Sequence, residues 1–370
     1  MRGVVFLGNR KLELRTFPDP TPGPDQVVIQ IKASGMCGSD LAPFRASQSP
    51  IALVNAGIRR ARHRGWGAVL KRARDRLHGN AGPFIRGHEP CGVIAARGSA
   101  LSDAESPIGQ SVLVHHYSGC GQCKHCRAGY TQQCLRGQPI VYGWEAHGGH
   151  APYMLLDRRA VVPMPEGLSF EEGAALGCGS GTAYAGVARI DLHAGETVAI
   201  HGAGPVGLSA TIFASNLGAR VIAIDFSESR LRLAKELGAT GLINAREVDS
   251  VQAVRDLTNG EGADASIDCT GLPKGRVATL QTTRYFGRAA FLGEGNPTTF
   301  DISRDFLRRQ ITVHGSHTMS TGQLAESARL VVERGLPLRR ILTHSFRLED
   351  AQSAYNLFDK QTIGKGYFVT

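Results

Sequence analysis

Four cysteines lie close together in one short stretch of the sequence. They follow the spacing CxxCxxCx7C at Cys120, Cys123, Cys126 and Cys134. Four thiolates gathered this tightly suit a closed, tetrahedral zinc ion. Disulfide bonds are the competing interpretation, but cysteines two residues apart in a chain without a secretory signal are more typical of reduced thiols. We therefore predict a structural zinc ion on this cluster.

The four remaining cysteines do not share one interpretation. Cys37 in GMCGSD and Cys178 in ALGCGSGTAY have suggestive surroundings, and His88 of GHE completes a possible Cys2His set. Three protein ligands and an open position are the arrangement of a catalytic zinc ion. Taken singly, each of these residues is more often a buried small residue or a satisfied histidine. Cys91 and Cys269 keep that plainer interpretation, since both lie in apolar, strand-like sequence.

A glycine-rich turn has the features of a dinucleotide site. Gly202, Gly204 and Gly207 form GxGxxG between a strand-like and a helix-like run, where the backbone reaches a pyrophosphate and the helix start supplies amide donors. Asp225 follows Gly207 by eighteen residues, where a carboxylate accepts bonds from ribose hydroxyls and repels a 2′-phosphate. This predicts NAD rather than NADP, and disfavours a turn without a ligand. Arg230 either faces a phosphate or lies against the adenine.

The elements that position these residues change character along the chain. In the first hundred or so residues, short strand-like runs such as VVIQIKASGMCG and CGVIAARG are separated by glycine and proline, which predicts a mostly antiparallel, barrel-like domain. From about Gly177 to Ser316, apolar strands alternate with helical stretches, which predicts a parallel sheet with helices on both faces. The tail has helical patterns at Leu324–Arg334 and Leu348–Leu357 and a closing strand, GKGYFV.

Length and composition agree with a two-domain globular enzyme. The chain has 370 residues, more than one core usually organises, and its 42% hydrophobic content excludes wholesale disorder. No apolar run reaches membrane-spanning length, so we expect a cytoplasmic protein without a membrane span. The net charge of +10 comes mainly from residues 59–76, which hold eight lysines and arginines against one aspartate. Because this charge is local, we expect no nucleic-acid partner.

The order and types of these motifs resemble those of the zinc-containing medium-chain alcohol and polyol dehydrogenases, over nearly all of the chain except about residues 45–82. The resemblance implies an α/β fold with two domains. A GroES-like, mostly-β catalytic domain is expected in residues 1–176, with a doubly wound Rossmann domain in residues 177–316. Residues 317–370 are expected to return to the catalytic domain.

The resemblance also implies roles for particular residues. It places a catalytic zinc ion on Cys37, His88 and Cys178, with Glu89 as a neighbouring carboxylate that can approach the metal. Structural zinc falls on the four clustered cysteines, which makes two zinc ions per chain. Asp40 matches the acid that orients the histidine ligand and fixes its tautomer.

The proton relay departs from the family pattern. Ser39 matches the hydroxyl that takes the substrate proton and passes it outward through the cofactor ribose. Many members end this relay with a histidine five residues after the first cysteine ligand, where this chain has Ala42. His63 or His78 of the basic insertion, or water, would have to replace it.

Five further residues complete the expected site. His116 falls where relatives often have an apolar wall of the substrate pocket, which points to a polar substrate, and Trp144 is expected to form another wall. Each is also compatible with simple core packing. We expect Pro205 and Val206 at the helix start, and Lys365 of the closing strand, to contact the cofactor.

The sequence thus predicts an NAD-dependent zinc alcohol dehydrogenase that acts on an alcohol or carbonyl substrate. The substrates considered include a polar or anionic alcohol such as a polyol. The enzyme is expected to form a homodimer or homotetramer. One alternative is a zinc-free reductase of the same superfamily, which would lack the ligand sets. Another is a non-catalytic protein that binds through the basic insertion. That insertion, roughly 45–82, is itself open to three interpretations: a solvated surface helix, a lid that presents arginines to an anionic substrate, or a subunit contact.

Overall fold

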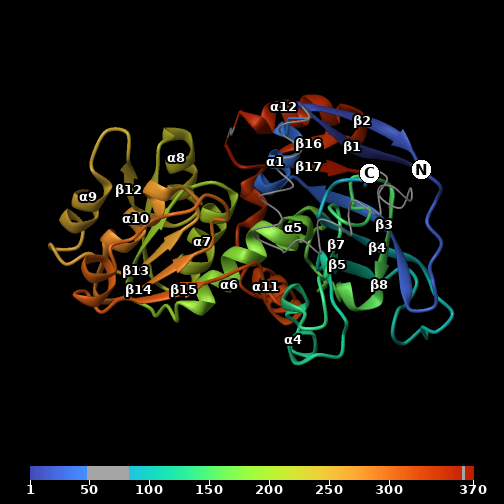
Figure 1. Cartoon of the computed structure of the whole chain (residues 1–370), viewed down its shortest axis with the longest axis horizontal. Coiled ribbons are helices and arrows are strands. Elements are labelled where there is room, and N and C mark those ends of the chain that lie inside the picture. The colour runs from blue at the N-terminus through green and yellow to red at the C-terminus, as the bar shows by residue number, and fades with distance from the viewer. Residues whose placement is uncertain (48–82, 361–362) are drawn as a thin grey trace.

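The computed structural model describes residues 1–47, 83–360 and 363–370. Figure 1 shows two lobes, one rich in strands that contains both chain ends and one in which a sheet is flanked by helices. Most of the basic insertion, with His63 and His78, lies outside the described residues. Among the helices of the described ranges, none is both long and apolar enough to cross a membrane.

The first lobe is built on a seven-stranded sheet. β3 pairs antiparallel with β17, β4 and β8, and the sheet continues from β4 through β5 to β9, while β16 lies outside β17. Its strands are β3 (Gln26–Gly35), β4 (Glu89–Arg97), β5 (Ser111–Val114), β8 (Tyr153–Asp157), β9 (Val161–Pro163), β16 (Leu342–Arg347) and β17 (Lys365–Val369). Two small antiparallel pairs accompany it: β1 (Arg2–Gly8) with β2 (Lys11–Thr16), and β6 (Tyr117–Ser118) with β7 (Ile140–Val141).

The residues of β3 explain why this segment forms the central strand of the sheet. Its apolar run includes Val27, Val28, Ile29 and Ile31, which are all buried. Consecutive residues of a strand point to opposite faces, so burial of both Val27 and Val28 means that both faces of β3 are covered, and a nearly continuous apolar run replaces strict alternation. Where β3 ends, Cys37 begins a turn, which places a zinc-ligand candidate at the margin of the sheet.

The second lobe holds a six-stranded sheet in the order β12-β11-β10-β13-β14-β15, with every neighbouring pair parallel. This is the strand order of a doubly wound dinucleotide-binding fold. The strands are β10 (Thr197–His201), β11 (Arg220–Asp225), β12 (Ala239–Asn244), β13 (Ala263–Asp268), β14 (Thr283–Phe291) and β15 (Thr312–Gly315). The connecting helices are α7 (Pro205–Asn216), α8 (Glu228–Glu236), α9 (Ser250–Asp256) and α10 (Pro273–Thr282).

Both faces of this sheet are covered. Along β10, Val198 and Ile200 pack into the main core cluster, whereas Ala199 between them belongs to a separate cluster on the opposite face. Successive side chains of a strand point to opposite faces, so two clusters mean two helix layers. The predicted α/β fold with a doubly wound domain and a mostly-β domain is therefore confirmed.

The remaining helices lie mainly in and around the first lobe. They are α1 (Leu41–Arg45), α4 (Lys124–Arg127), α5 (Phe170–Ala175), α6 (Gly181–Arg189), α11 (Thr321–Glu333) and α12 (Ala351–Asp359). Short 3-10 turns are η1 (Gly38–Asp40), η2 (Thr131–Gln133), η3 (Arg158–Ala160), η6 (Leu338–Ile341) and η7 (Leu348–Asp350), and π-helical turns are η4 (Leu176–Ser180) and η5 (Ser303–Leu307).

The helices of the tail differ slightly from their predicted limits. α11 begins at Thr321, three residues before the predicted start, because Ser320 and Gln323 form a reciprocal capping pair at its first turn. The second predicted helix begins at Leu348 as a 3-10 turn and becomes α-helical only from Ala351.

Candidate active site

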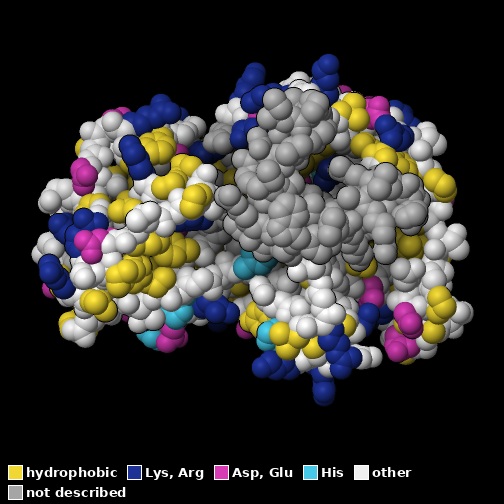
Figure 2. Space-filling model, viewed as in Figure 1, with side chains coloured by type: hydrophobic (Ala, Val, Ile, Leu, Met, Phe, Trp, Pro, Cys, Tyr) yellow, Lys and Arg dark blue, Asp and Glu magenta, His cyan; other side chains and the backbone are white. Residues whose placement is uncertain are grey.

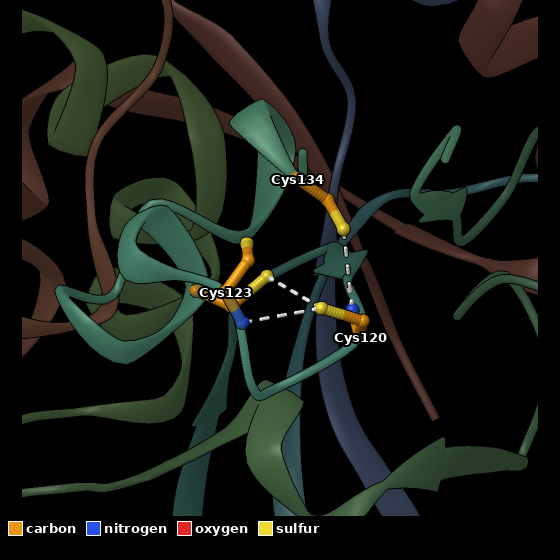
Figure 3. A group of neighbouring side chains, drawn as sticks. Cys120, Cys123 and Cys134 are labelled. Carbon is orange, nitrogen blue, oxygen red and sulfur yellow. Dashed lines mark hydrogen bonds between the residues drawn. The ribbon is translucent and has the colours of Figure 1, made fainter. Parts of the chain in front are cut away.

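The four clustered cysteines come together on the loop between β6 and β7. Their sulfur atoms all lie within 4.8 Å of one another, and Figure 3 shows Cys120, Cys123 and Cys134 turned toward a common centre. Backbone N–H groups support the sulfurs: Cys123 N–H donates to Cys120 Sγ, and Leu135 N–H donates to Cys123 Sγ, both at 3.4 Å.

These backbone donors favour the thiolate form of Cys123. The N–H of Leu135 has the largest effect on the pKa of Cys123 and that of Cys126 the next largest, and the pKa is lowered to about 6. Four sulfurs at this separation, with amides directed at them, fit a closed tetrahedral zinc site. None of the eight cysteines is paired in a disulfide, which agrees with the zinc interpretation of the cluster.

A second cluster forms where three separate segments meet. Cys37 caps η1 after β3, His88 directly precedes β4, and Cys178 lies in the π-helical turn η4. One ligand atom from each of these residues and from Glu89 lies within 4.8 Å of the others, and the two sulfurs are 3.9 Å apart. Contact with Cys178 and the nearby His88 holds the pKa of Cys37 well below its usual value, against the opposing effect of burial.

Asp40 holds the imidazole of this cluster in place. Its Oδ1 lies 3.1 Å from His88 Nδ1, and its Oδ2 accepts the N–H of Cys37 at 3.0 Å. Although burial opposes it, the pairing with His88 keeps the pKa of Asp40 well below its usual range. The His88 Nδ1 proton is thereby fixed toward Asp40, which leaves Nε2 for a metal ion. Ser39 Oγ borders this nitrogen at 3.3 Å.

Glu89 is held by a partner on each of its two carboxylate oxygens. Its Oε1 accepts the N–H of Gly179 at 3.0 Å, and its Oε2 forms a fully buried ion pair with Lys365. The ammonium of Lys365 also donates to Met36 O at 2.9 Å. Burial raises the pKa of Glu89 to about 7, while Lys365 opposes that shift. The carboxylate therefore sits close to the cluster as the partner of a buried lysine.

Two predicted pocket residues lie against His88. The His116 ring is 4.9 Å from the His88 ring, and the Trp144 ring is 6.4 Å from it, measured between centroids. His116 Nδ1 is 3.0 Å from Gly177 O, and burial lowers the pKa of His116 well below its usual value. His116 is thus a neutral imidazole that donates through Nδ1.

The glycine turn joins β10 to α7 as the sequence predicts. Gly202 has φ +92°, a left-handed conformation that favours glycine. A Cβ on Gly207 would overlap the carbonyl oxygen of Gly202, whereas a Cβ on Gly204 would meet no atom within 4 Å. The turn is closed on its inner side and open at Gly204. Pro205 and Val206 form the first turn of α7, and Val206 lies next to Gly179, so the cofactor loop borders the turn that carries Cys178.

Asp225 ends β11 beside this turn. Its Oδ2 accepts the N–H of Ala203 at 2.7 Å, and its Oδ1 accepts the N–H of Ser227 at 2.9 Å. The guanidinium of Arg230 lies 3.8 Å from the same carboxylate. An open glycine backbone, a helix start and a strand-end carboxylate fit the pyrophosphate and ribose of a dinucleotide.

Comparison with known proteins agrees with this geometry. Residues 23–166 match the alcohol dehydrogenase GroES-like domain, and residues 205–333 match the zinc-binding dehydrogenase family. The chain is 36% identical, over 99% of its length and 97% of the relative's, to the zinc-type alcohol dehydrogenase-like protein YphC of Escherichia coli K12. The chain belongs to the zinc-dependent medium-chain dehydrogenase family.

Two further similarities support this assignment. The dehydrogenase is 29% identical to the sorbitol dehydrogenase of Bacillus subtilis over 96% of its own length and 92% of the relative's. It superposes on a solved NAD-dependent alcohol dehydrogenase with a TM-score of 0.81 at 28% identity, covering 100% of both chains. The predicted class is confirmed: the protein is a zinc- and NAD-dependent oxidoreductase acting on alcohols.

The structure of the dehydrogenase adds residues that the sequence did not indicate. Tyr355 OH donates to Asp40 Oδ2 at 3.3 Å, and His150 Nε2 lies 2.8 Å from Tyr355 OH. These residues are far from Asp40 in sequence and belong to no recognisable motif, so only the fold brings them together. The buried pairing of Lys365 with Glu89 was likewise not foreseen, and the contact of Lys365 with the cofactor stays a prediction.

The structure also places Cys91, Cys269 and Ala42, which the sequence did not assign to the site. Cys91 is fully buried, and its Sγ donates to Phe170 O at 2.8 Å, which agrees with a packing role. Cys269 is only partly buried, because it follows the end of β13 rather than lying within the strand. Ala42 is exposed on α1, so the relay position that lacks histidine faces the surface.

Proposed function

We propose that this dehydrogenase carries out hydride transfer between an alcohol carbon and NAD at the cluster of Cys37, His88 and Cys178. The observation that carries the proposal is the convergence of these ligand atoms, with Glu89, within 4.8 Å beside the hydroxyl of Ser39. A zinc ion on this set would supply a Lewis acid that lowers the pKa of an alcohol hydroxyl.

The other residues of the site have separate proposed roles in binding and proton transfer. Asp40 orients His88 by accepting the Nδ1 proton of the imidazole, and Cys37 remains partly exposed. Ser39, whose side chain is exposed, receives the proton that the substrate hydroxyl gives up. Asp225 accepts bonds from the ribose, while the backbone N–H groups of Gly204 and Val206 receive the pyrophosphate and Pro205, which has no N–H, contacts the cofactor through its ring.

The substrate class we propose is a polar or anionic alcohol such as a polyol. His116 places an imidazole, rather than a hydrocarbon side chain, 4.9 Å from His88, which supports polar surroundings for the substrate. The basic insertion, outside the described residues, adds guanidinium groups in the sequence between Cys37 and His88, which would suit phosphate or carboxylate.

A substrate screen tests reaction and substrate class together. NADH absorbance is followed with polyols, sugar phosphates and apolar alcohols, and the highest kcat/KM is expected for a polyol or an anionic alcohol. Best activity on apolar alcohols would contradict the substrate class. Undiminished activity after both zinc ions have been removed would favour a zinc-free reductase. Charge reversal of Arg59, Arg60 and Arg62 to Glu should raise KM for an anionic substrate far more than for NAD.

We further propose a homodimer or homotetramer. β15 forms one edge of the six-stranded sheet, and in the described part of the chain no strand covers its outer side. Tyr285, Phe286, Ile302 and Leu307 are 58 to 67% exposed nearby, and Phe286 N–H donates to Arg309 O, which ties the two segments together. Hydrophobic side chains also gather over β13 and β14 in Figure 2. Light scattering of the wild type and of Leu307→Glu should show loss of the oligomer in the variant.

Two assignments complete the proposal. The domain limits are residues 1–176, 177–316 and 317–370, supported by the separation of the two sheets and by the pairing of β17 with β3. Residues 177–316 expressed alone should fold and bind NAD, which would test these limits. A cytoplasmic location is supported by the two clusters of cysteine ligands, whose thiols must stay reduced, and cell fractionation tests it.

A further inference from the structure

A row of five buried polar groups runs inward from the zinc-ligand candidate His88. Asp40 Oδ1 is 3.1 Å from His88 Nδ1, and Asp40 Oδ2 accepts the hydroxyl of Tyr355 at 3.3 Å. The Tyr355 hydroxyl is 2.8 Å from His150 Nε2, and His150 Nδ1 is 2.8 Å from Ser34 Oγ. None of these five side chains is more than 2% exposed.

The direction of each hydrogen bond follows from the groups at the two ends. The carboxylate of Asp40 only accepts, so the Tyr355 hydroxyl must donate to it and accept from His150 Nε2–H. Burial lowers the pKa of His150 to about 4, so the ring is neutral and Nδ1 accepts from the Ser34 hydroxyl. Every proton in the row therefore points toward Asp40, which receives bonds from Tyr355, His88 and the N–H of Cys37.

The surroundings of Tyr355 and His150 are apolar. The Tyr355 ring packs edge-on against Phe6 at 4.7 Å and lies 5.4 Å from Phe44, while the His150 ring lies edge-on to Phe368 at 4.7 Å. Hydrocarbon side chains would fill such a cluster without the cost of burying a hydroxyl and an imidazole, a cost that only complete hydrogen bonding removes. The row meets that condition, since each polar side-chain atom in it has a partner.

We propose that Tyr355 and His150 are positioning residues for the catalytic zinc ion, and that they act by fixing the Asp40 carboxylate. Asp40 in turn holds two ligands at once, His88 through its ring and Cys37 through its backbone N–H. The row ends at Ser34, which is fully buried, so it is a support for the ligands and not an exit for the substrate proton. The inference rests on the zinc site proposed above.

The test compares zinc release from intact holoenzymes challenged with a chelator, read with a zinc indicator. Tyr355→Phe removes only the hydroxyl, and its catalytic zinc should leave about tenfold or more faster, the usual scale for loss of a partner behind a metal ligand. The structural zinc should leave at the wild-type rate. kcat should fall while KM for NAD stays unchanged, because Asp225 and the glycine turn are untouched.

Matched variants separate positioning from a general loss of stability. Tyr142→Phe is the control, since it removes another buried tyrosine hydroxyl of the same lobe, one that accepts Asp157 N–H at 2.8 Å. It should leave both release rates unchanged. His150→Phe should behave like Tyr355→Phe, whereas His150→Gln, whose amide both donates and accepts, should restore much of the slow release. If Tyr355→Phe fails to fold, comparison of His150→Phe with His150→Gln tests the positioning role instead.

Two results would overturn the inference in distinguishable ways. If the wild type holds two zinc ions and Tyr355→Phe and His150→Phe release both at wild-type rates, the zinc site stands and the positioning role is wrong. If the wild type itself binds only the structural zinc ion, the proposed catalytic site is wrong and the positioning role falls with it.

Discussion

The carboxylate of Asp225 accepts the backbone N–H of Ala203 at 2.7 Å. This bond joins the end of β11 to the middle of the glycine turn after β10, so the group expected to bind ribose also braces the loop expected to hold pyrophosphate. Ser227 N–H donates to the other carboxylate oxygen. Asp225 is therefore fixed in orientation before any cofactor arrives.

Asp225 should determine the choice of cofactor. The wild type is expected to use NAD with a higher kcat/KM than NADP, because the carboxylate repels a 2′-phosphate. Asp225→Asn, which keeps an oxygen for Ala203 N–H, should lower kcat/KM for NAD roughly tenfold or more, the scale of a hydrogen bond to a charged group. Steady-state kinetics with both cofactors measures this.

A control for this prediction lies in the same domain. Asp249 caps α9 by accepting Gln252 N–H at 2.8 Å, and Asp249→Asn should leave cofactor preference unchanged. Equal or better use of NADP by the wild type would mean that Arg230 or another cation controls the pocket.

Substitutions at two glycines of the same turn should have different effects, one on stability and one on cofactor binding. Gly207→Ala forces a Cβ into the carbonyl oxygen of Gly202 and should destabilise the fold by about 1–3 kcal/mol or more. Gly204→Ala meets no atom within 4 Å and should keep the wild-type Tm, yet weaken NAD binding because its methyl group occupies the open cradle. Thermal unfolding and cofactor titration separate the two effects. A Gly204→Ala variant with unchanged NAD affinity would place the pyrophosphate elsewhere.

The cofactor turn shows how much the sequence predicts. A local pattern of glycines, strand and acid was enough to locate Gly202 and Asp225, because their geometry depends on one βαβ unit. The zinc-ligand candidates Cys37, His88 and Cys178 come from three distant segments. Their local sequences suggested a Cys2His set, the family resemblance assigned it to a catalytic zinc ion, and the structure brings the three residues together.

The sequence could not predict side-chain contacts that depend on packing between segments far apart in the chain. Tyr355 looks like an ordinary amphipathic-helix residue, and His150 like one histidine among thirteen. Their roles appear only when α12 packs against the loop before β8 and directs the hydroxyl toward Asp40. The partner of Lys365 was hidden for the same reason, since Glu89 is 276 residues away in the chain.

Metal analysis should find about two zinc ions per chain. Cys37→Ala should lose one equivalent and all turnover while it keeps the other, because the four clustered cysteines are independent of Cys37. Cys91→Ala is the matched control: this buried thiol belongs to neither ligand set and should keep both equivalents. Full activity in Cys37→Ala would disprove the catalytic assignment.

Ser39 should carry the substrate proton. Ser39→Ala is expected to slow alcohol oxidation by roughly a hundredfold, the scale of a positioned proton-transfer group. Ser39→Thr keeps a hydroxyl next to His88 Nε2 and should retain much of the rate. Pre-steady-state formation of NADH measures both. A near-wild-type rate for Ser39→Ala would show that the proton leaves by another route.

The pairing of β17 with β3 also sets an order of events during synthesis. β17 (Lys365–Val369) completes the sheet whose first strand along the chain is β3 (Gln26–Gly35), and it brings the ammonium that pairs with Glu89. At about 5–20 residues per second, the ribosome delivers this strand roughly tens of seconds after β3. All strands of the Rossmann sheet are synthesised before β17, so this sheet can form while the lobe of Cys37 and His88 still lacks its last strand.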